Sequence, residues 1–375
     1  MKATLALENG QWFEGVSAGA PGETAGEVVF NTSLTGYQEV LTDPSYAGQI
    51  VTMTAPQIGN YGVTAEDVES RGVQVAGFVV REASRVASNW RADGTLRDYL
   101  AANGVVAVAE IDTRALTRIL RSAGVMRGVI ATGDVDPAAL VDKARSIPVM
   151  EGRDLVRAVT CEAPFDWSQP PAAEDPLVPP PGRRARRRLR VAAYDCGMKW
   201  NILRRFAVHG CDVRVFPATA PAATVLEMRP DGVFFSNGPG DPAALPYLVE
   251  TARAIVEADV PVFGICLGHQ VLGLALGGRT YKLKFGHHGT NHPVKYLPTG
   301  QVEITSQNHG FAVDADSLPG DVAVTHVNLY DQTVEGLRHR HRPVFSVQYH
   351  PEAAPGPHDA DYLFSLFLDE MERRA

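Results

Sequence analysis

The sequence predicts an α/β protein of two domains, in which a mixed α/β domain is followed by a doubly wound α/β domain. A segment rich in proline and arginine, residues 166–189, separates two stretches of ordinary globular composition. After this segment, strand-like and helix-like runs alternate, which is typical of a parallel sheet with helices on both faces. The length of 375 residues suits two domains. We therefore expect domains at 1–165 and 190–375.

Residues 166–189 are predicted to be a linker because neither half of the segment suits a core. Prolines concentrate between Pro170 and Pro181, where they remove backbone donors and favour extended chain. Arginines follow between Arg183 and Arg190, and clustered like charges repel one another. An arginine run can form a nucleic-acid or localisation patch, but the formal charge of -8 and the pI near 5.8 argue against a general nucleic-acid role. A solvated linker, which an acidic partner could contact, is the favoured interpretation.

The first domain is predicted to combine strands with a helix. Asn9-Gly10 suits a tight turn, so the flanking segments Leu5–Glu8 and Gln11–Glu14 are expected to form a hairpin. Asp112–Ser122 has apolar residues at helical spacing after an aspartate cap, which predicts an amphipathic helix. Apolar runs predict further strands at Glu27–Phe30, Gln49–Met53, Val73–Val80 and Val105–Ala109.

The second domain is predicted from the alternation of its segments. Strands are expected at Val191–Tyr194, Asp212–Phe216, Gly232–Phe235 and Pro261–Ile265. Helices are expected at Lys199–Val208, at Tyr247–Glu257 and from Leu267 onward. Ligands bind beyond the carboxyl ends of the strands in such sheets, and Gly238 and Cys266 should both emerge there.

One of the four cysteines has neighbours that suit a nucleophile. The cysteines lack the CxxC spacing of a zinc site and are too sparse for a disulfide framework. Cys266 differs from a small buried hydrophobe because it lies between a predicted strand and helix, with Gly264 and Gly268 on either side. This pattern resembles a nucleophile elbow with cysteine in place of serine. The positive end of the helix dipole would favour the thiolate, which is the reactive form.

A histidine must accompany the thiolate, because the leaving nitrogen needs a proton and a later water must lose one. His350 follows the predicted strand Pro343–Tyr349, and Glu352 lies two residues beyond it. Glu352 can then fix the tautomer of His350, which completes a Cys-His-Glu triad. A surface histidine near a glutamate is the commoner explanation of this tripeptide alone, but the cysteine elbow makes the triad the better one.

The backbone N–H of Leu267 is predicted to be one donor for the oxyanion of the reaction. Gly238 and Gly240, in the turn after Gly232–Phe235, would let a ligand approach the backbone closely. A purely structural turn explains these glycines equally well.

Two groups of histidines are not assigned a function. His287, His288 and His292 lack a carboxylate or cysteine at ligand spacing, so polar packing in a loop is expected and no metal site is predicted. His339 and His341 alternate with arginines, which is typical of a solvated turn between strands.

The sequence also limits where the protein acts. Its first residues reach Glu8 without the apolar core of a signal peptide, and no stretch approaches a membrane span. We therefore expect a cytoplasmic protein.

Three motifs occur in the order typical of the class I, triad-type glutamine amidotransferases, and the second domain resembles that family. They are Ser236-Asn-Gly-Pro-Gly-Asp-Pro242, Gly264-Ile-Cys-Leu-Gly-His-Gln270 and His350-Pro-Glu352. The first domain resembles the carbamoyl-phosphate synthase small chain. Four segments carry that resemblance: Phe30-Asn-Thr-Ser-Leu-Thr-Gly-Tyr37, Leu41-Thr-Asp-Pro-Ser-Tyr46, Pro56-Gln-Ile-Gly-Asn-Tyr61 and Ile111-Asp-Thr-Arg-Ala-Leu116.

The resemblance implies a glutaminase that passes ammonia to a large synthetase subunit, where ATP and bicarbonate become carbamoyl phosphate for arginine and pyrimidine biosynthesis. It implies no cofactor in this chain, with ATP and its metal on the large subunit, and it is compatible with a hetero-oligomer of higher order. The chain accordingly has no G-x-x-x-x-G-K phosphate loop. By the same resemblance, the contacts to L-glutamine fall on Ser45, Gly238, Gly240, Leu267, Gln270, Asn308, Gly310 and Phe311.

Two other functions remain open on the residues alone. The glutaminase parts of GMP, CTP or anthranilate synthases share the second domain, although they lack a first domain like this one. A free-standing cysteine peptidase or hydrolase would use the same elbow and triad without a partner. A catalytically silent binding subunit is disfavoured because Cys266, His350 and Glu352 are all present.

Overall fold

The computed structural model describes residues 1–168 and 185–374, so most of the predicted linker 166–189 lies outside the described residues. The chain divides into two compact units. Unit 1 contains Met1–Met150 and Lys284–Gly289, and unit 2 contains Glu151–Leu283 and Thr290–Ala375.

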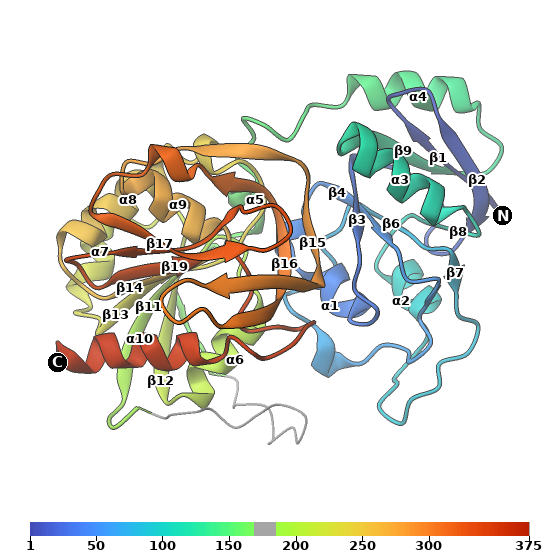
Figure 1. The fold of residues 1–375 in the computed structure, drawn as a ribbon. Helices are drawn as coiled ribbons and strands as arrows, with labels where there is room; N and C mark the ends of the chain where they lie inside the picture. Colours follow the sequence, from blue (N-terminus) through green and yellow to red (C-terminus); the bar gives the residue numbers. More distant parts are fainter. Residues whose placement is uncertain (169–184, 375) are drawn as a thin grey trace. The chain divides into compact units, whose positions relative to one another are not determined.

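Unit 1 is built around a closed barrel of seven strands, ordered β1-β2-β8-β6-β4-β3-β9 (Figure 1). Six of the strands lie where the apolar runs predicted strands, some of them shorter than expected. The bounds are β1 Lys2–Leu7, β2 Trp12–Ser17, β3 Glu23–Asn31, β4 Gln49–Met53, β6 Gly77–Val79, β8 Ala107–Ala109 and β9 Met126–Thr132. A separate pair consists of β5 (Gln57–Ile58) and β7 (Glu82–Ala83).

Helices pack against the barrel of unit 1. The predicted amphipathic helix is α3 (Thr113–Ala123), and the side chain of Asp112 caps it by accepting the N–H of Ala115. Leu116 and Leu120 on its inner face pack into the core beside β1 and β3. The other helices are α1 (Tyr37–Thr42), α2 (Leu96–Ala102) and α4 (Pro137–Ser146), with short 3-10 turns at Pro44–Tyr46 and Ala65–Asp67.

Unit 2 contains a ten-stranded sheet, ordered β10-β12-β11-β13-β14-β19-β18-β17-β15-β16. Strands β12 to β19 in this order are parallel, which confirms the predicted doubly wound arrangement. Their bounds are β12 Cys211–Pro217, β11 Leu189–Asp195, β13 Gly232–Phe235, β14 Val262–Ile265 and β19 Val344–Val347. The strand β10 (Phe165–Asp166) pairs with β12 in the antiparallel sense. Asp166 and Leu189, the two ends of the predicted linker, therefore lie in strands of this sheet.

Helices cover both faces of the parallel strands. One face packs against α6 (Trp200–Val208) and α10 (Tyr362–Arg373) through an aromatic cluster that includes Phe206, Phe364 and Phe367. The other face packs against α7 (Ala222–Glu227), α8 (Pro246–Glu257) and α9 (Leu267–Ala275). The short helix α5 (Val156–Val159) packs on this second face through Val156.

Antiparallel strands extend the sheet beyond β19. They are β18 (Val334–His339), β17 (Val322–Asn328), β15 (Thr280–Tyr296) and β16 (Val302–Val313). The predicted polar loop at His287, His288 and His292 is wrong, because all three residues lie in β15. Within unit 1, the Thr32 N–H donates to the His288 carbonyl at 3.1 Å, which holds this part of β15.

The predicted solvated turn at residues 338–342 needs a correction at its first histidine. His339 is the last residue of β18 and is buried, and its Nδ1 accepts the backbone N–H groups of His341 and Arg342 at 3.1 Å each. Its Nε2 lies 3.2 Å from Asp321. The imidazole therefore organises the turn, while His341 itself is exposed.

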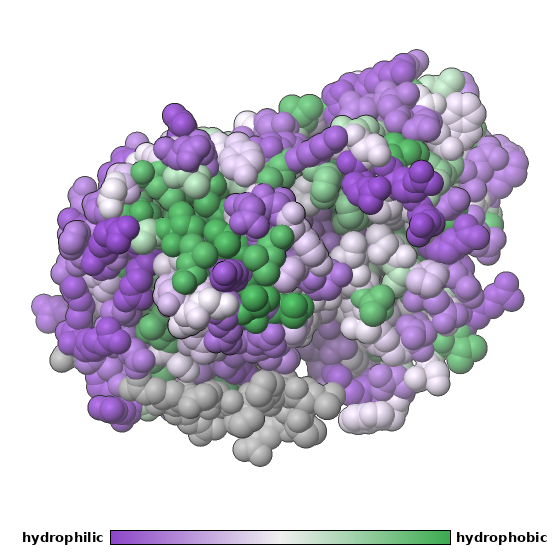
Figure 2. Space-filling model, in the orientation of Figure 1, coloured by the Kyte–Doolittle hydropathy of each residue, from purple (hydrophilic) through white to green (hydrophobic). Residues whose placement is uncertain are grey.

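The visible face is mainly hydrophilic, with a hydrophobic area over the strands of unit 2 (Figure 2). Among the described residues, no helix combines the length and the apolar character needed to cross a bilayer.

The aromatic cluster on the α6–α10 face is expected to contribute strongly to the stability of unit 2. Phe364 is buried, and its ring lies 5.2 Å from that of Phe206 and 6.0 Å from that of Phe263. Phe364→Ala would leave a cavity and should lower the free energy of unfolding by about 3–5 kcal/mol in guanidinium titrations. Phe165→Ala, a partly exposed phenylalanine on the edge strand β10, is the matched control and should cost less than about 1 kcal/mol. Equal losses for both variants would contradict this assignment.

Candidate active site

Cys266 occupies a sharp turn between β14 and α9. Its backbone has φ 54° and ψ -104°, a conformation that costs a residue with a side chain about 1–3 kcal/mol. The Cys266 N–H donates to the Val347 carbonyl of the neighbouring strand at 2.9 Å, which holds the turn against the sheet. The thiol is therefore fixed at the carboxyl end of the parallel strands and at the N-terminus of α9, as expected for an elbow.

The glycines around Cys266 are required by close backbone contacts. A Cβ on Gly268 would lie 2.1 Å from the Phe235 carbonyl oxygen. A Cβ on Gly264 would lie 2.6 Å from Leu272 and 2.9 Å from Gly268. Only glycine fits both positions, because real Cβ atoms do not approach other heavy atoms so closely.

His350 and Glu352 form a buried hydrogen-bonded pair. His350 Nδ1 lies 2.7 Å from Glu352 Oε1, and the His350 N–H donates to the Ser306 carbonyl at 2.9 Å. Both side chains are buried in unit 2. Glu352 therefore fixes the ring orientation and leaves Nε2 for chemistry, as the sequence predicted.

Lys199, which the sequence reasoning did not find, is the second partner of Glu352. Its Nζ lies 3.1 Å from Glu352 Oε1 and also donates to the Ala353 carbonyl. Burial alone would raise the pKa of the Glu352 carboxyl, but the charges of Lys199 and His350 lower that pKa to about 2. Glu352 thus stays ionised at neutral pH. Lys199 precedes α6 and lies far from Glu352 in the sequence, so no local motif reveals it.

The electrostatic environment keeps His350 protonated. Burial alone would lower the pKa of its imidazole, but the Glu352 carboxylate and then the interaction with Cys266 raise that pKa to about 10. The His350 side chain interacts with Cys266, so a proton donor lies beside the sulfur.

A segment of β16 lies beside the elbow. Cys266 Sγ is 3.4 Å from the Asn308 carbonyl oxygen. Gln270 Nε2 donates to the Phe311 carbonyl at 2.8 Å and to Gln348 Oε1 at 3.1 Å. A Cβ on Gly310 would meet no atom within 4 Å, so space remains there.

The turn that follows β13, which contains Gly238 and Gly240, also contacts the elbow. A Cβ on Gly238 would lie 2.9 Å from the side chain of Leu267, and the Gly268 N–H donates to the Ser236 carbonyl at 3.0 Å. Gly240 has φ +91° and lies against the Arg153 carbonyl, which favours glycine for conformation and for space. Gly240 therefore shapes the turn itself.

Ser45 belongs to unit 1, where its N–H donates to Asp43 Oδ1 at 2.8 Å. All the other residues predicted to contact glutamine belong to unit 2. The contact of Ser45 with glutamine stays a prediction.

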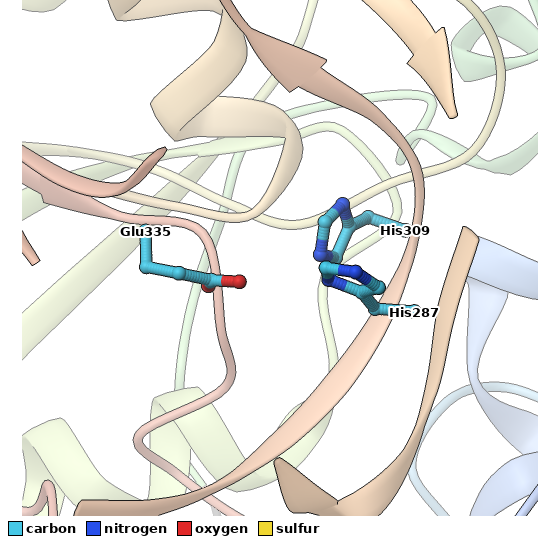
Figure 3. Close-up of side chains that lie close together, drawn as sticks. All are labelled: His287, His309 and Glu335. Carbon is cyan, nitrogen blue, oxygen red and sulfur yellow. The ribbon is translucent and has the colours of Figure 1, made fainter. Parts of the chain in front are cut away.

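His309 and Glu335, two of the residues labelled in Figure 3, have structural partners within unit 2. The Glu335 carboxylate accepts hydrogen bonds from Gln307 Nε2 and Asn328 Nδ2, both at 2.9 Å. His309 Nδ1 donates to the Phe311 carbonyl at 2.7 Å, which fixes the tautomer of this imidazole. Glu335 therefore joins β16, β17 and β18, while His309 braces the segment of β16 beside the elbow.

Comparison with known proteins places each part of the chain. The family model for glutamine amidotransferase class-I matches residues 192–370, and the model for the carbamoyl-phosphate synthase small chain, CPSase domain, matches residues 5–130. Among solved structures, a glutamine amidotransferase from Thermotoga maritima covers 50% of this chain and is itself covered to 85%, with 20% identity and a TM-score of 0.37.

Curated relatives match over the full length. The carbamoyl phosphate synthase small chain of Syntrophotalea carbinolica is 56% identical, with 100% of this chain and 98% of that protein covered. The small chain of a Synechococcus species is 55% identical, with 99% and 94% covered. This chain therefore belongs to the carbamoyl phosphate synthase small-chain family.

Proposed function

We propose that this chain hydrolyses L-glutamine to glutamate and ammonia with Cys266, His350 and Glu352, and passes the ammonia to a large synthetase subunit. The observation that carries the proposal is the cysteine at a strained strand-to-helix turn, in the same unit as a buried His350–Glu352 pair. Full-length relatives named for the small chain of a synthase support the destination of the ammonia.

The first half of the reaction forms a glutamyl thioester. The Cys266 thiolate attacks the side-chain amide carbon, and the carbonyl oxygen becomes an oxyanion. The Leu267 N–H is suited to stabilise that oxyanion, because the first residues of a helix have no helical acceptor for their N–H groups. The His350 imidazolium then gives its proton to the leaving nitrogen, the C–N bond breaks and ammonia departs.

The second half releases glutamate. Neutral His350 takes a proton from a water molecule, and the resulting hydroxide attacks the thioester carbon. The C–S bond breaks, which regenerates the Cys266 thiolate and the His350 imidazolium. Glu352 stabilises the imidazolium throughout, and Lys199 keeps Glu352 ionised.

The substrate is proposed to lie between the elbow and the segment 308–311. Backbone groups of Gly238 and Leu267 would surround the reacting amide, and Gln270 braces the segment by its hydrogen bond to Phe311. The remaining proposed contacts are Ser45, Gly240, Asn308 and Gly310.

The partner and pathway are proposed from the family. The large subunit would bind ATP, its metal and bicarbonate and would make carbamoyl phosphate for arginine and pyrimidine biosynthesis. This chain would need no cofactor of its own and would act in the cytoplasm. A free-standing cysteine hydrolase is the alternative, but it gives no reason for the match of residues 5–130 to a synthase small chain.

Cys266→Ser tests the ammonia-donor role. In the complex with the large subunit, this variant should lose glutamine-dependent carbamoyl phosphate synthesis by at least about a thousandfold, because a serine hydroxyl is a poor nucleophile beside an imidazolium. Synthesis from added ammonium chloride should stay unchanged. Both rates are measured as carbamoyl phosphate formed per minute.

Cys211→Ser is the matched control, because Cys211 is buried away from the elbow and burial raises the pKa of its thiol to about 12. It should keep both activities. Loss of the ammonia-dependent activity in Cys266→Ser would argue against the proposed role.

The raised pKa of His350 predicts a pH dependence of stability. Between pH 6.5 and about 10, His350 holds a proton in the folded chain but not in the unfolded one, so the folded state binds more protons. The stabilisation that this bound proton gives the folded chain is complete below pH 6.5 and is lost as the pH rises through 10. Between pH 7.5 and 9, the unfolding free energy of the wild-type chain should fall as the pH rises. This fall should be steeper than that of His350→Gln by up to about 1.4 kcal/mol per pH unit.

Guanidinium titrations at several pH values measure this difference. His341→Gln removes an exposed histidine and should keep the wild-type slope. Identical slopes for wild type and His350→Gln would rule out the buried imidazolium.

A further inference from the structure

Unit 1 exposes a tryptophan that none of the proposed chemistry uses. Trp90 is 93% exposed, and Val86 on the same loop is 68% exposed. The loop lies between β7 and α2 and contains no helix or strand (Figure 1). An indole can cover on the order of 200 Å² of a partner, and tryptophan is among the residues most enriched at the energetic centres of interfaces.

The loop is anchored along its length, so the exposure of Trp90 is built into the fold. The Ser88 N–H donates to the Asn60 carbonyl at 2.8 Å, before the tryptophan. Directly after it, Arg91 binds Asp67 at 2.7 Å and Glu66 at 2.9 Å.

Backbone contacts complete the anchoring of this loop. The Asp93 N–H donates to the Val63 carbonyl at 2.8 Å, and the Val63 N–H donates to the Gly94 carbonyl at 3.1 Å. A Cβ on Gly62 would lie 2.7 Å from the Cβ of Ala92, so this loop packs closely against the segment that follows β5. A side chain presented from such a backbone loses little conformational freedom when it binds.

A second apolar side chain is held by the same segment of unit 1. Leu34 is 79% exposed, in the turn before α1. Gly36 donates its N–H to the Tyr61 hydroxyl at 2.6 Å, and Tyr61 directly follows the Asn60 that holds Ser88. Both loops are thus fixed to residues 60–61. We group their exposed apolar side chains as the Trp90 surface (Leu34, Val86 and Trp90).

We propose that the Trp90 surface is a docking site for the large synthetase subunit. This inference rests on the proposed function, which requires that subunit. The triad lies entirely in unit 2, whereas the match of unit 1 is to a domain of the synthase small chain. A stable interface needs about 800 Å² from each partner, so these three side chains would form its apolar centre and polar neighbours its rim.

The affinity of the full-length chain for the purified large subunit tests the proposal. Trp90→Ala should raise the dissociation constant at least about 30-fold, as expected for a central aromatic anchor. Trp90→Phe should retain most of the affinity. Titration calorimetry gives the constants, and iodide quenching of tryptophan fluorescence should fall when the wild-type complex forms.

Trp12→Ala is the matched control, because Trp12 is 51% exposed on β2 of the same unit. It should change the dissociation constant less than about twofold. The unfolding midpoint and the glutaminase rate of the isolated Trp90→Ala chain should equal those of wild type, since Trp90 belongs to neither the core nor the site.

Two results would overturn the proposal. One is wild-type affinity of Trp90→Ala for the large subunit. The other is self-association of the wild-type chain in sedimentation that Trp90→Ala abolishes without changing that affinity, which would assign the surface to a second copy. Failure of wild type itself to bind the large subunit would instead contradict the proposed function.

Discussion

The strained backbone at Cys266 is the constraint on which the rest of unit 2 depends. A positive φ at a residue with a side chain persists only where the surroundings enforce it. Here Val347 holds the Cys266 N–H from one strand, and Ser236 holds the Gly268 N–H from the loop after another. The packing of the parallel sheet therefore offsets the cost of this backbone conformation and keeps the thiol at the edge of the sheet. The aromatic core that stabilises the sheet supports the site in the same way.

Buried charged groups of alternating sign lie at the same edge of the sheet. Lys199, Glu352 and His350 form a chain of contacts at 3.1 and 2.7 Å, and a thiolate at Cys266 would complete it. Each group alone would carry a large desolvation penalty, and each is stabilised by its neighbours. The arrangement keeps Glu352 ionised and His350 protonated, because the opposite charges beside each group lower the pKa of Glu352 and raise the pKa of His350. The sequence motifs identify every member of this chain except Lys199.

The sequence predicted the parallel sheet and the elbow well because their signals are local. Val262–Ile265 is apolar throughout, and the glycines at 264 and 268 mark the tight turn by themselves. Two features had no such signal. Lys199 meets Glu352 only through the fold. The histidines of β15 lie beside glycines and a proline, a composition that favours a loop, and the strand is evident only in the sheet, where its end pairs with β17.

Under the proposed function, unit 2 holds the triad and unit 1 holds the docking surface. Every charge that activates the thiol lies in unit 2, and the same elbow would serve any class I amidotransferase. The destination of the ammonia must then be determined elsewhere, because nothing in a Cys-His-Glu site distinguishes one acceptor from another. We propose that unit 1 meets that need: the strands of its barrel are closed on one another, so its exposed loops are the part we assign to binding. Apolar side chains that rigid loops hold in water cost an isolated chain free energy. In a complex, the same side chains provide a binding surface.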